Sequence, residues 1–429
     1  MTVILDSNRP IVDSNKIKPP LTYPLLQAII HRRSRRFRLG HEMPFPPLQY
    51  KSDKGPVPLS KLETALLCFA GAGTTGMVLT EITPGFGANT TMHWSARAFP
   101  SPCNNHRTHL IFTDDDGLYL YEPALAKKVV EVETLSDLEE RVNNFDKEIV
   151  KLKDGRLDLA PRPPATWTLN SGMINRRGQT MFMPIVDPAY EMIDMALVSI
   201  QFDHYLFYDD ITGKAAGVEK WIDKLGLNVR VPISTLDSGA VVSCSLEAGF
   251  ICQNILLMAQ AIGLGAFPFS GYAPLVIMGG TPITRGLGFR YVTDKKGMPN
   301  PVGIDGILEG YCPPYKTMDE AVDAIVEQKY GSGGIFTAES TELCAYKDPK
   351  SIVEAMAKDK IPDDVIQCTK DLCNYIYEKY GRFPATIDTM SLPIMFVAHH
   401  IDTDFYKKYY APGAVTENQE THISKWHST

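Results

Sequence analysis

The chain contains stretches with two kinds of apolar spacing, one typical of helices and one typical of strands. Apolar residues three or four positions apart mark a helix with one buried face. This spacing predicts helices at residues 23–34, 62–71, 134–152, 187–202, 245–265, 317–330, 362–381 and 393–410. The first helix is expected to bury its apolar residues, which are Leu25, Leu26, Ile29 and Ile30. The stretch 245–265 is apolar almost all round, so we expect a fully buried helix there.

Short segments rich in β-branched and aromatic residues predict strands at 108–113, 117–123, 179–186 and 287–292. Asp115-Asp116-Gly117 joins the first two and has the composition of a tight turn, which predicts a hairpin. Strands and helices interleave along the chain. This order indicates an α+β protein built around one sheet.

Two predicted helices carry start signals. Ser60 is followed three residues later by Glu63, the pattern of a capping box. Thr134 or Ser136 is expected to cap the helix that begins there. These signals fix where the two helices should begin.

Composition narrows the classes of function. The chain has 429 residues, a net charge of −7, and 44% hydrophobic and 22% charged residues, as ordinary globular proteins do. Its acidic balance argues against binding to nucleic acid or to an anionic membrane. The first 20 residues lack the apolar core of a signal peptide, and no apolar run is expected to span a bilayer. The eight cysteines are scattered, which predicts reduced thiols in a cytoplasmic protein.

The segment Gly71 to Gly76, GAGTTG, matches the glycine fingerprint of dinucleotide-binding folds. That fingerprint works only between a strand and a helix, with an acidic residue about 20 positions later. Here a predicted helix precedes the glycines, and a β-branched, glycine-containing stretch follows them. We therefore interpret GAGTTG as a helix end followed by a turn.

Positive charge is concentrated in the segment HRRSRRFRLG, residues 31–40, which holds five arginines. Basic residues favour the C-terminal end of a helix, and a solvated helix end would explain the cluster. A nucleic-acid patch is a second explanation. The interruption by Ser34 and Phe37 favours a third one, a site for a phosphorylated small ligand, because guanidinium and hydroxyl groups bind phosphate together.

Three motifs occur in a defined order. They are Arg32-Arg33-Ser34-Arg35-Arg36, then Pro100-Ser101-Pro102-Cys103-Asn104, then Gly263-Leu264-Gly265 with Pro268-Phe269-Ser270-Gly271. Together they resemble the FMN-dependent nitroreductase-like superfamily over about residues 20–310. The segment PSPCNNHRTHLIFTDDDGLYLYEP is similar to the azoline-oxidising dehydrogenase branch. The resemblance implies a mostly antiparallel central sheet flanked by helices, a homodimer with FMN at its interface, and NAD(P)H as electron donor.

The resemblance also implies which residues bind FMN. Arg32, Ser34 and Arg36 match contacts to the phosphate, the ribityl chain and the pyrimidine edge, and Arg33 is a neighbouring candidate. A guanidinium at the pyrimidine edge, assigned to Arg36, would stabilise the negative charge of reduced flavin.

Two further groups of flavin contacts follow from the resemblance. Ser101, Pro102 and Asn104 match a segment that approaches the flavin from the partner subunit. Pro268 matches a residue over the ring, and Ser270 and Gly271 match a turn whose backbone N–H faces N5. Lys296, with Lys295, is the best match for a second phosphate contact. No metal ligand and no catalytic acid or base is predicted.

The resemblance divides the chain into an irregular lead-in (1–20), an FMN-binding domain (21–316) with an insertion at about 124–236, and a helical C-terminal extension (317–429). The expected reaction is hydride transfer between NAD(P)H and an electron-poor small molecule. Two alternatives stay open, namely a dehydrogenase that passes electrons to oxygen and a flavin-binding module without turnover.

Several other polar residues have alternative interpretations. His106 or His109 could donate a proton to a substrate, or both could be polar surface residues. Arg176 and Arg177 in the insertion could meet an acidic substrate or form surface salt bridges. His399 and His400 are adjacent, so on a helix they point to different faces and cannot bind one metal together. We expect them in solvent or at an interface.

Overall fold

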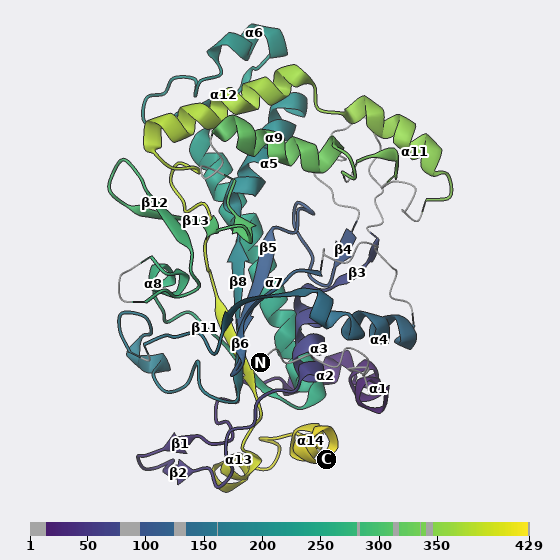
Figure 1. Cartoon of the computed structure of the whole chain (residues 1–429), viewed down its shortest axis with the longest axis vertical. Coiled ribbons are helices and arrows are strands. Elements are labelled where there is room, and N and C mark those ends of the chain that lie inside the picture. Colours follow the sequence, from purple (N-terminus) through teal and green to yellow (C-terminus); the bar gives the residue numbers. More distant parts are fainter. Residues whose placement is uncertain are drawn as a thin grey trace, which may run out of the picture.

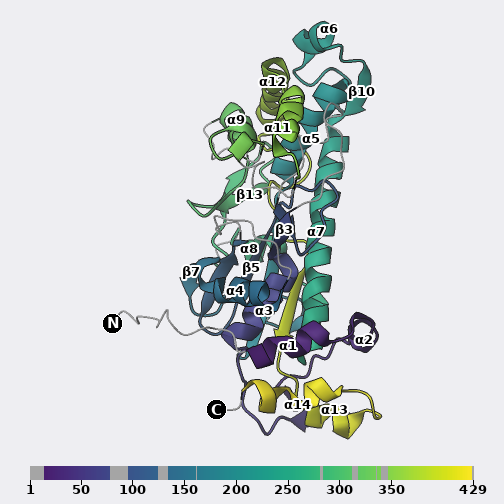
Figure 2. The ribbon, with the colours of Figure 1, turned by 90° about the vertical axis from the view of Figure 1, so that its right-hand side faces the viewer.

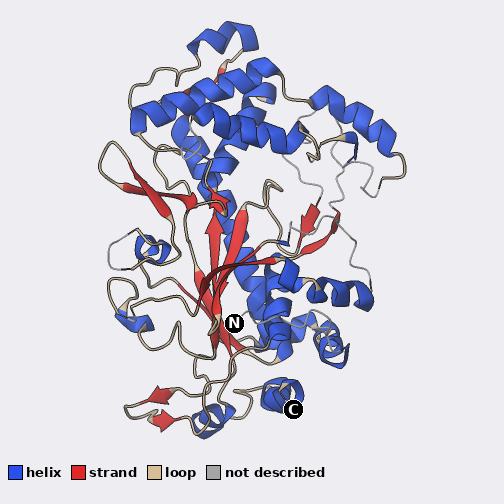
Figure 3. Cartoon of the chain, in the orientation of Figure 1, coloured by secondary structure: helices blue, strands red, loops and turns tan. Residues whose placement is uncertain are grey.

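A computed structural model describes residues 14–77, 95–123, 134–160, 162–280, 284–311, 317–334, 336–339 and 346–427. Residues 1–13 of the predicted lead-in and the beginning of the predicted insertion lie outside these ranges. The described residues form an α+β architecture in which helices cover a central sheet (Figures 1 and 3).

The central sheet has six strands in the order β11-β15-β8-β5-β6-β7, and every neighbouring pair is antiparallel. The strands are β5 (Thr108–Thr113), β6 (Gly117–Tyr121), β7 (Ile149–Asp154), β8 (Gln179–Val186), β11 (Gly265–Phe269) and β15 (Met395–His399). All eight residues of β8 are buried, which is expected of a strand in the middle of a sheet covered on both faces.

Smaller strands form four satellite sheets. They are β1 (Glu42–Met43) with β2 (Tyr50–Lys51), β3 (Thr74–Met77) with β4 (Ser95–Arg97), β9 (Tyr205–Tyr208) with β10 (Val229–Pro232), and β12 (Arg290–Thr293) with β13 (Pro299–Ile304) and β14 (Leu308–Glu309).

The helices differ greatly in length, from one turn to the 30 residues of α7. They are α1 (Ser14–Thr22), α2 (Leu25–His31), α3 (Lys61–Ala72), α4 (Leu135–Asn143), α5 (Pro188–Phe202), α6 (Ile222–Leu225), α7 (Ile233–Ile262), α8 (Pro274–Met278), α9 (Met318–Tyr330), α11 (Pro349–Met356), α12 (Asp363–Tyr380), α13 (Thr403–Tyr409) and α14 (Glu417–Trp426). Figure 2 shows α7 running along one side of the molecule, from the helical layer at the top towards α13 and α14 at the bottom.

Hydrophobic side chains fill both faces of the central sheet. On one face, Phe112, Phe182 and Phe396 pack with α3 and α7. On the other face, Met181 and Val397 pack with α8 and the segment around Leu157. A third cluster joins α5, α9, α12 and the beginning of α7 beyond the end of the sheet. The middle strands of the sheet are thus buried on both faces, whereas the edge strand β7, with sequence IVKLKD, is partly exposed.

Length and composition would allow α7 to cross a membrane, which contradicts the prediction that no segment could. It is the one such helix among the described residues. In this structure α7 packs against α3, α5 and strands of the sheet. The long core helix of a globular domain passes the same test, so this observation is weak evidence for a membrane span.

Several local predictions are confirmed. Ser60 and Glu63 form a capping box at the start of α3, and Thr134 caps α4 in the same way with Asp137. β5 and β6 form the predicted hairpin. GAGTTG covers the end of the helix α3 and the start of the strand β3, which is the reverse of what a dinucleotide fingerprint requires. The predicted helix end is confirmed, but a strand follows it where a turn was predicted.

The N-terminal predictions need correction. The lead-in is not irregular throughout, because residues 14–22 form α1. The next helix, α2, does not bury its apolar residues, since Leu25, Leu26, Ile29 and Ile30 are 50–67% exposed. Only Ala28 of α2 is buried. The side of α2 that packs on α7 is therefore its small-residue side.

Two segments predicted as helix contain strands of the central sheet. The 134–152 helix stops at Asn143, and β7 begins at Ile149. The 393–410 segment forms β15 before α13, and β15 lies between β11 and β8. The C-terminal region is therefore not an entirely helical extension. Both segments find backbone partners in the sheet that local periodicity does not reveal.

Candidate functional site

A pocket of about 400 Å³ lies between the arginine segment and the C-terminal α13. This volume falls within the range typical of small-molecule sites. Arg33, Ser34, Arg35, Arg36, Phe37, Met43, Leu48, Met173, Phe405, Tyr406, Tyr410, Gly413 and Ala414 line it. The pocket therefore combines cationic side chains with aromatic ones.

Exposed and buried side chains alternate over residues 34–37. Arg35 and Phe37 are buried, whereas Ser34 and Arg36 are exposed. The Arg35 guanidinium donates to Ala414 O at 2.7 Å and to Gln260 Oε1 at 3.1 Å. Buried Arg35 thus acts as a structural clamp and leaves its neighbours to meet a ligand.

Aromatic contacts fix the far wall of the pocket. The rings of Phe37 and Phe405 stack with their centroids 3.9 Å apart. The Tyr406 hydroxyl accepts a hydrogen bond from the Phe37 N–H at 3.0 Å. These contacts tie α13 to the arginine segment and keep the pocket formed without a ligand.

Two arginine side chains at the pocket lack a carboxylate partner among the described residues. The Arg36 guanidinium lies 5.0 Å from the ring centroid of Phe267 in β11, and among the described residues it has no carboxylate partner. Arg33 donates to the carbonyls of Ile30 and Arg32 and has no carboxylate partner there either. An anionic ligand would supply the missing negative charge.

The arginine segment carries a further buried positive charge. Arg38 is buried, and its Nε has no hydrogen-bond partner within the described part of the chain. Burial, together with Arg176 and Arg156, lowers the pKa of Arg38 to about 10. Burial and Arg38 also lower the pKa of His41 to about 4, so His41 is neutral near pH 7. Arg176 forms no salt bridge in the described ranges, unlike the predicted surface pair, and its Nε is buried.

The structure brings together only some of the predicted FMN contacts. Arg33, Ser34 and Arg36 line one pocket, and Pro268 follows Phe267 on β11. Arg32 is half-buried outside the pocket lining. The Ser270-Gly271 turn is partly covered by the insertion, because the Trp167 N–H and the Asn170 side chain both donate to Gly271 O.

Ser101, Pro102 and Asn104 lie far from the pocket in the same chain. They precede β5, where Thr108 pairs with Val186 at one end of β8. Gln179, at the other end of β8, pairs with His399, whose Nε2 lies 3.0 Å from Arg35 O. Seven residue steps along β8 correspond to about 24 Å. The two groups can meet at one ligand only if a second copy of the chain contributes one of them.

The histidines that follow Asn104 are not free proton donors. Burial, with help from Arg97, lowers the pKa of His106 to about 3, so its imidazole is neutral near pH 7. His109 Nδ1 lies 3.5 Å from a carboxylate oxygen of Glu122.

Lys296 is not at the pocket. It occupies the exposed turn between β12 and β13, and its N–H donates to Asp294 Oδ1 at 2.8 Å. The Lys295 N–H donates to Tyr380 O at the end of α12. Figure 1 shows this hairpin beside the α12 layer, whereas α13 lies at the opposite end of the molecule. Within one chain, Lys296 therefore cannot serve as the second phosphate contact.

Sequence analysis missed the aromatic wall formed by Phe405, Tyr406 and Tyr410. These residues recur at helical spacing within the predicted helix at 393–410. Nothing local links them to an arginine segment almost 370 positions earlier.

The adjacent histidines also differ from expectation. His399 and His400 are both buried rather than exposed. They do not share a site, as predicted, because His399 bonds to Arg35 O while His400 faces Glu63.

Comparison with known proteins does not identify a family for this chain. No protein-family model matches the chain, and no curated protein matches it. Among solved structures, it is similar to a "putative nitroreductase" from Ralstonia eutropha JMP134, with 14% identity over 58% of this chain and 71% of the other and a TM-score of 0.26. That score is too low to support an argument. The α+β class stands on the elements described above.

Proposed function

We propose that this protein is a flavin-dependent oxidoreductase that binds FMN in the arginine-lined pocket and works as a homodimer. The observation that carries this proposal is the convergence of Arg33, Ser34 and Arg36 on one pocket with an aromatic wall. When bound, FMN would supply hydride transfer between NAD(P)H and an electron-poor small molecule.

The side chains at the pocket suit such a ligand. Arg33 and Ser34 offer a guanidinium and a hydroxyl to a phosphate. Arg36, held over Phe267, offers a fixed positive charge to the ring system, where it would stabilise the negative charge of the reduced form. None of these roles needs a side-chain acid or base, which agrees with the neutral state of nearby His41.

A homodimer would supply the remaining contacts. In their own chain, Ser101 and Asn104 precede the strand that pairs with the Val186 end of β8, whereas the arginine segment contacts the strand paired with the Gln179 end, and β8 spans about 24 Å. The exposed apolar side of α2, immediately before the arginine segment, is the surface on which we expect the second copy to pack.

The test is the visible spectrum of the full-length protein produced with ample riboflavin. We expect a yellow protein that releases FMN on denaturation and is bleached by NADPH under anaerobic conditions. Arg36→Ala should weaken FMN binding about 10- to 100-fold, the usual effect of losing one charge-assisted contact.

Arg230→Ala is the matched control. Arg230 is another exposed arginine stacked on an aromatic ring, with its guanidinium 4.8 Å from the Tyr208 centroid. It should leave FMN affinity unchanged. A colourless protein that does not take up added FMN would overturn the proposal, as would equal FMN affinity in the two variants.

A further inference from the structure

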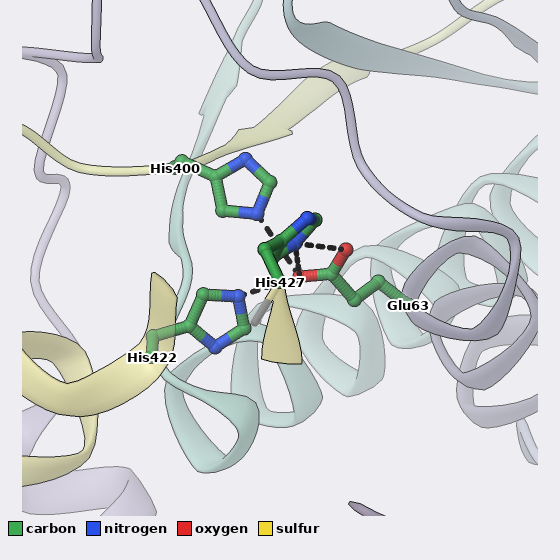
Figure 4. Close-up of side chains that lie close together, drawn as sticks. All are labelled: Glu63, His400, His422 and His427. Atoms are coloured by element: carbon green, nitrogen blue, oxygen red, sulfur yellow. Dashed lines mark hydrogen bonds and ion pairs between the residues drawn. The ribbon is translucent and has the colours of Figure 1, made fainter. Parts of the chain in front are cut away.

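Four side chains from distant parts of the chain meet at one point, which we call the Glu63 cluster (Figure 4). Its members are Glu63 in the first turn of α3, His400 after β15, His422 in α14 and His427 at the end of α14. Their ligand atoms all lie within 4.8 Å of one another. In Figure 4 the three imidazoles surround the carboxylate.

Short contacts join each imidazole to the carboxylate. The Nε2 atoms of His400 and His422 lie 3.0 and 2.5 Å from Glu63 Oε1, and the Nε2 atom of His427 lies 3.1 Å from Oε2. The Ser60 N–H also donates to Oε2, at 2.5 Å. The carboxylate is thus held in one orientation by the cap of α3.

The opposite ring nitrogens determine which tautomer is present. His400 Nδ1 lies 2.9 Å from Val57 O, and His422 Nδ1 lies 2.6 Å from Ile262 O. A carbonyl oxygen only accepts, so each Nδ1 must carry a hydrogen, and in a neutral imidazole Nε2 then presents its lone pair. Two lone pairs directed at a carboxylate repel it. A positive charge removes this conflict, either a second proton on a ring, which makes an imidazolium, or a metal ion bound by the lone pairs. An Nδ1–H bonded to a carbonyl is the usual second contact of a metal-binding histidine.

The spacing of the ligand atoms suits a small metal ion. Ligands about 2.0–2.1 Å from a tetrahedral metal lie about 3.3 Å from one another. The nitrogen–oxygen distances here are 2.5 to 3.1 Å. They are about 0.2 to 0.8 Å shorter than this separation, so the ligand atoms need to move apart by that amount to admit the ion. The Glu63, His400 and His422 side chains are at most 2% exposed, and His427 is 20% exposed, which leaves one side for entry.

We propose that the Glu63 cluster binds one divalent transition-metal ion, for which Zn²⁺ is the reference probe. Three imidazole nitrogens and one carboxylate oxygen supply the four protein ligands that a tetrahedral ion needs, which is the pattern of a structural site rather than a catalytic one. Imidazole-rich sites favour zinc and its neighbours over magnesium or calcium.

The role of the ion would be to hold α14 against the core. The residues just before α14 form the rim of the arginine-lined pocket. Gln260 of α7 links this rim to the arginine segment, because it accepts hydrogen bonds from Arg35 and Gln419 and donates one to Thr416 Oγ1. Because His422 and His427 both belong to the α14 region, metal binding would fasten this rim to α3 and β15.

The experiment measures metal content and metal affinity of the full-length protein. After chelation and dialysis, titration with Zn²⁺ should give one ion per chain, and Co²⁺ should give visible bands of tetrahedral coordination. His427→Gln, which replaces the most exposed ligand, should weaken Zn²⁺ binding at least about tenfold. Zn²⁺ should also raise the melting temperature of the wild type.

Two more variants keep the test decisive. His204→Gln makes the same change at an exposed histidine outside the cluster and should retain full Zn²⁺ affinity. Glu63→Gln retains a side-chain oxygen for the Ser60 N–H but removes the charge, and it should also bind Zn²⁺ at least about tenfold more weakly. Wild-type protein that takes up no stoichiometric Zn²⁺ or Co²⁺ would refute the site. Equal affinities in all variants would do so too. These readouts do not depend on flavin, so they fail or succeed independently of the proposed oxidoreductase.

Discussion

Glu191 gives a prediction whose size follows directly from its surroundings. It lies in the first turn of α5 and is 1% exposed. The carboxylate accepts a hydrogen bond from Asn105 Nδ2 at 2.6 Å and interacts with the Cys103 thiol. Burial raises the pKa of Glu191 from 4.5 to about 7, and the nearby charges of Asp194 and Glu247 add to the rise.

The sign of the effect on stability follows from this shift. At pH values below 4.5 the carboxyl is protonated in both the folded and the unfolded chain. As the pH rises from 4.5 to about 7, the unfolded chain loses its proton first, so the folded state becomes less stable. Between pH 5 and pH 8 this difference costs the folded state about 2.5 kcal/mol.

Glu191→Gln removes this pH dependence. The variant should gain about 2.5 kcal/mol relative to the wild type between pH 5 and pH 8, whatever its stability at pH 5. Urea unfolding at a series of pH values measures the gap at each pH. Glu354→Gln makes the same change at an exposed position on α11 and should follow the wild-type profile. A constant gap between wild type and Glu191→Gln across this range would refute the reasoning.

Two further predictions concern buried charge and assembly. Lys329 Nζ lies 2.7 Å from Asp194 Oδ1, and both side chains are fully buried. Lys329→Met should therefore lower the free energy of unfolding, measured with urea, by about 3–5 kcal/mol, because it leaves the Asp194 charge buried. Adding Asp194→Asn should recover part of this loss. An unchanged unfolding midpoint for Lys329→Met would contradict the prediction. Leu26 and Ile30 on α2 are 67% and 53% exposed, and we expect them in a dimer interface. The double variant Leu26→Asp, Ile30→Asp should weaken dimerisation by about 3 kcal/mol, or about 100-fold in Kd, as measured by sedimentation equilibrium. Ile211→Asp, at another exposed apolar position, should leave the Kd unchanged. A monomeric wild type would exclude this interface.

Short-range features of this protein could be predicted from the sequence. The capping boxes at Ser60 and Thr134 depend on residues three positions apart, and the β5–β6 turn depends on three consecutive residues. Arg33, Ser34 and Arg36 line one pocket because they are neighbours in a single short segment of the chain. In each case the interacting groups are near neighbours in the chain.

The tertiary structure decided what depends on distant partners. β15 is buried on both faces, and four of its five residues are apolar, so its sequence does not distinguish a central strand from a buried helix. Its hydrogen-bond partners in β8 and β11 decide that it is a strand. Likewise, His400 and Glu63 are 337 positions apart, and no local pattern relates them. The same is true of the separation of the arginine segment and the segment before β5, which adjoin strands paired with opposite ends of β8. Local spacing determines which side of its own element a side chain occupies, whereas only packing between elements determines which distant side chain it meets.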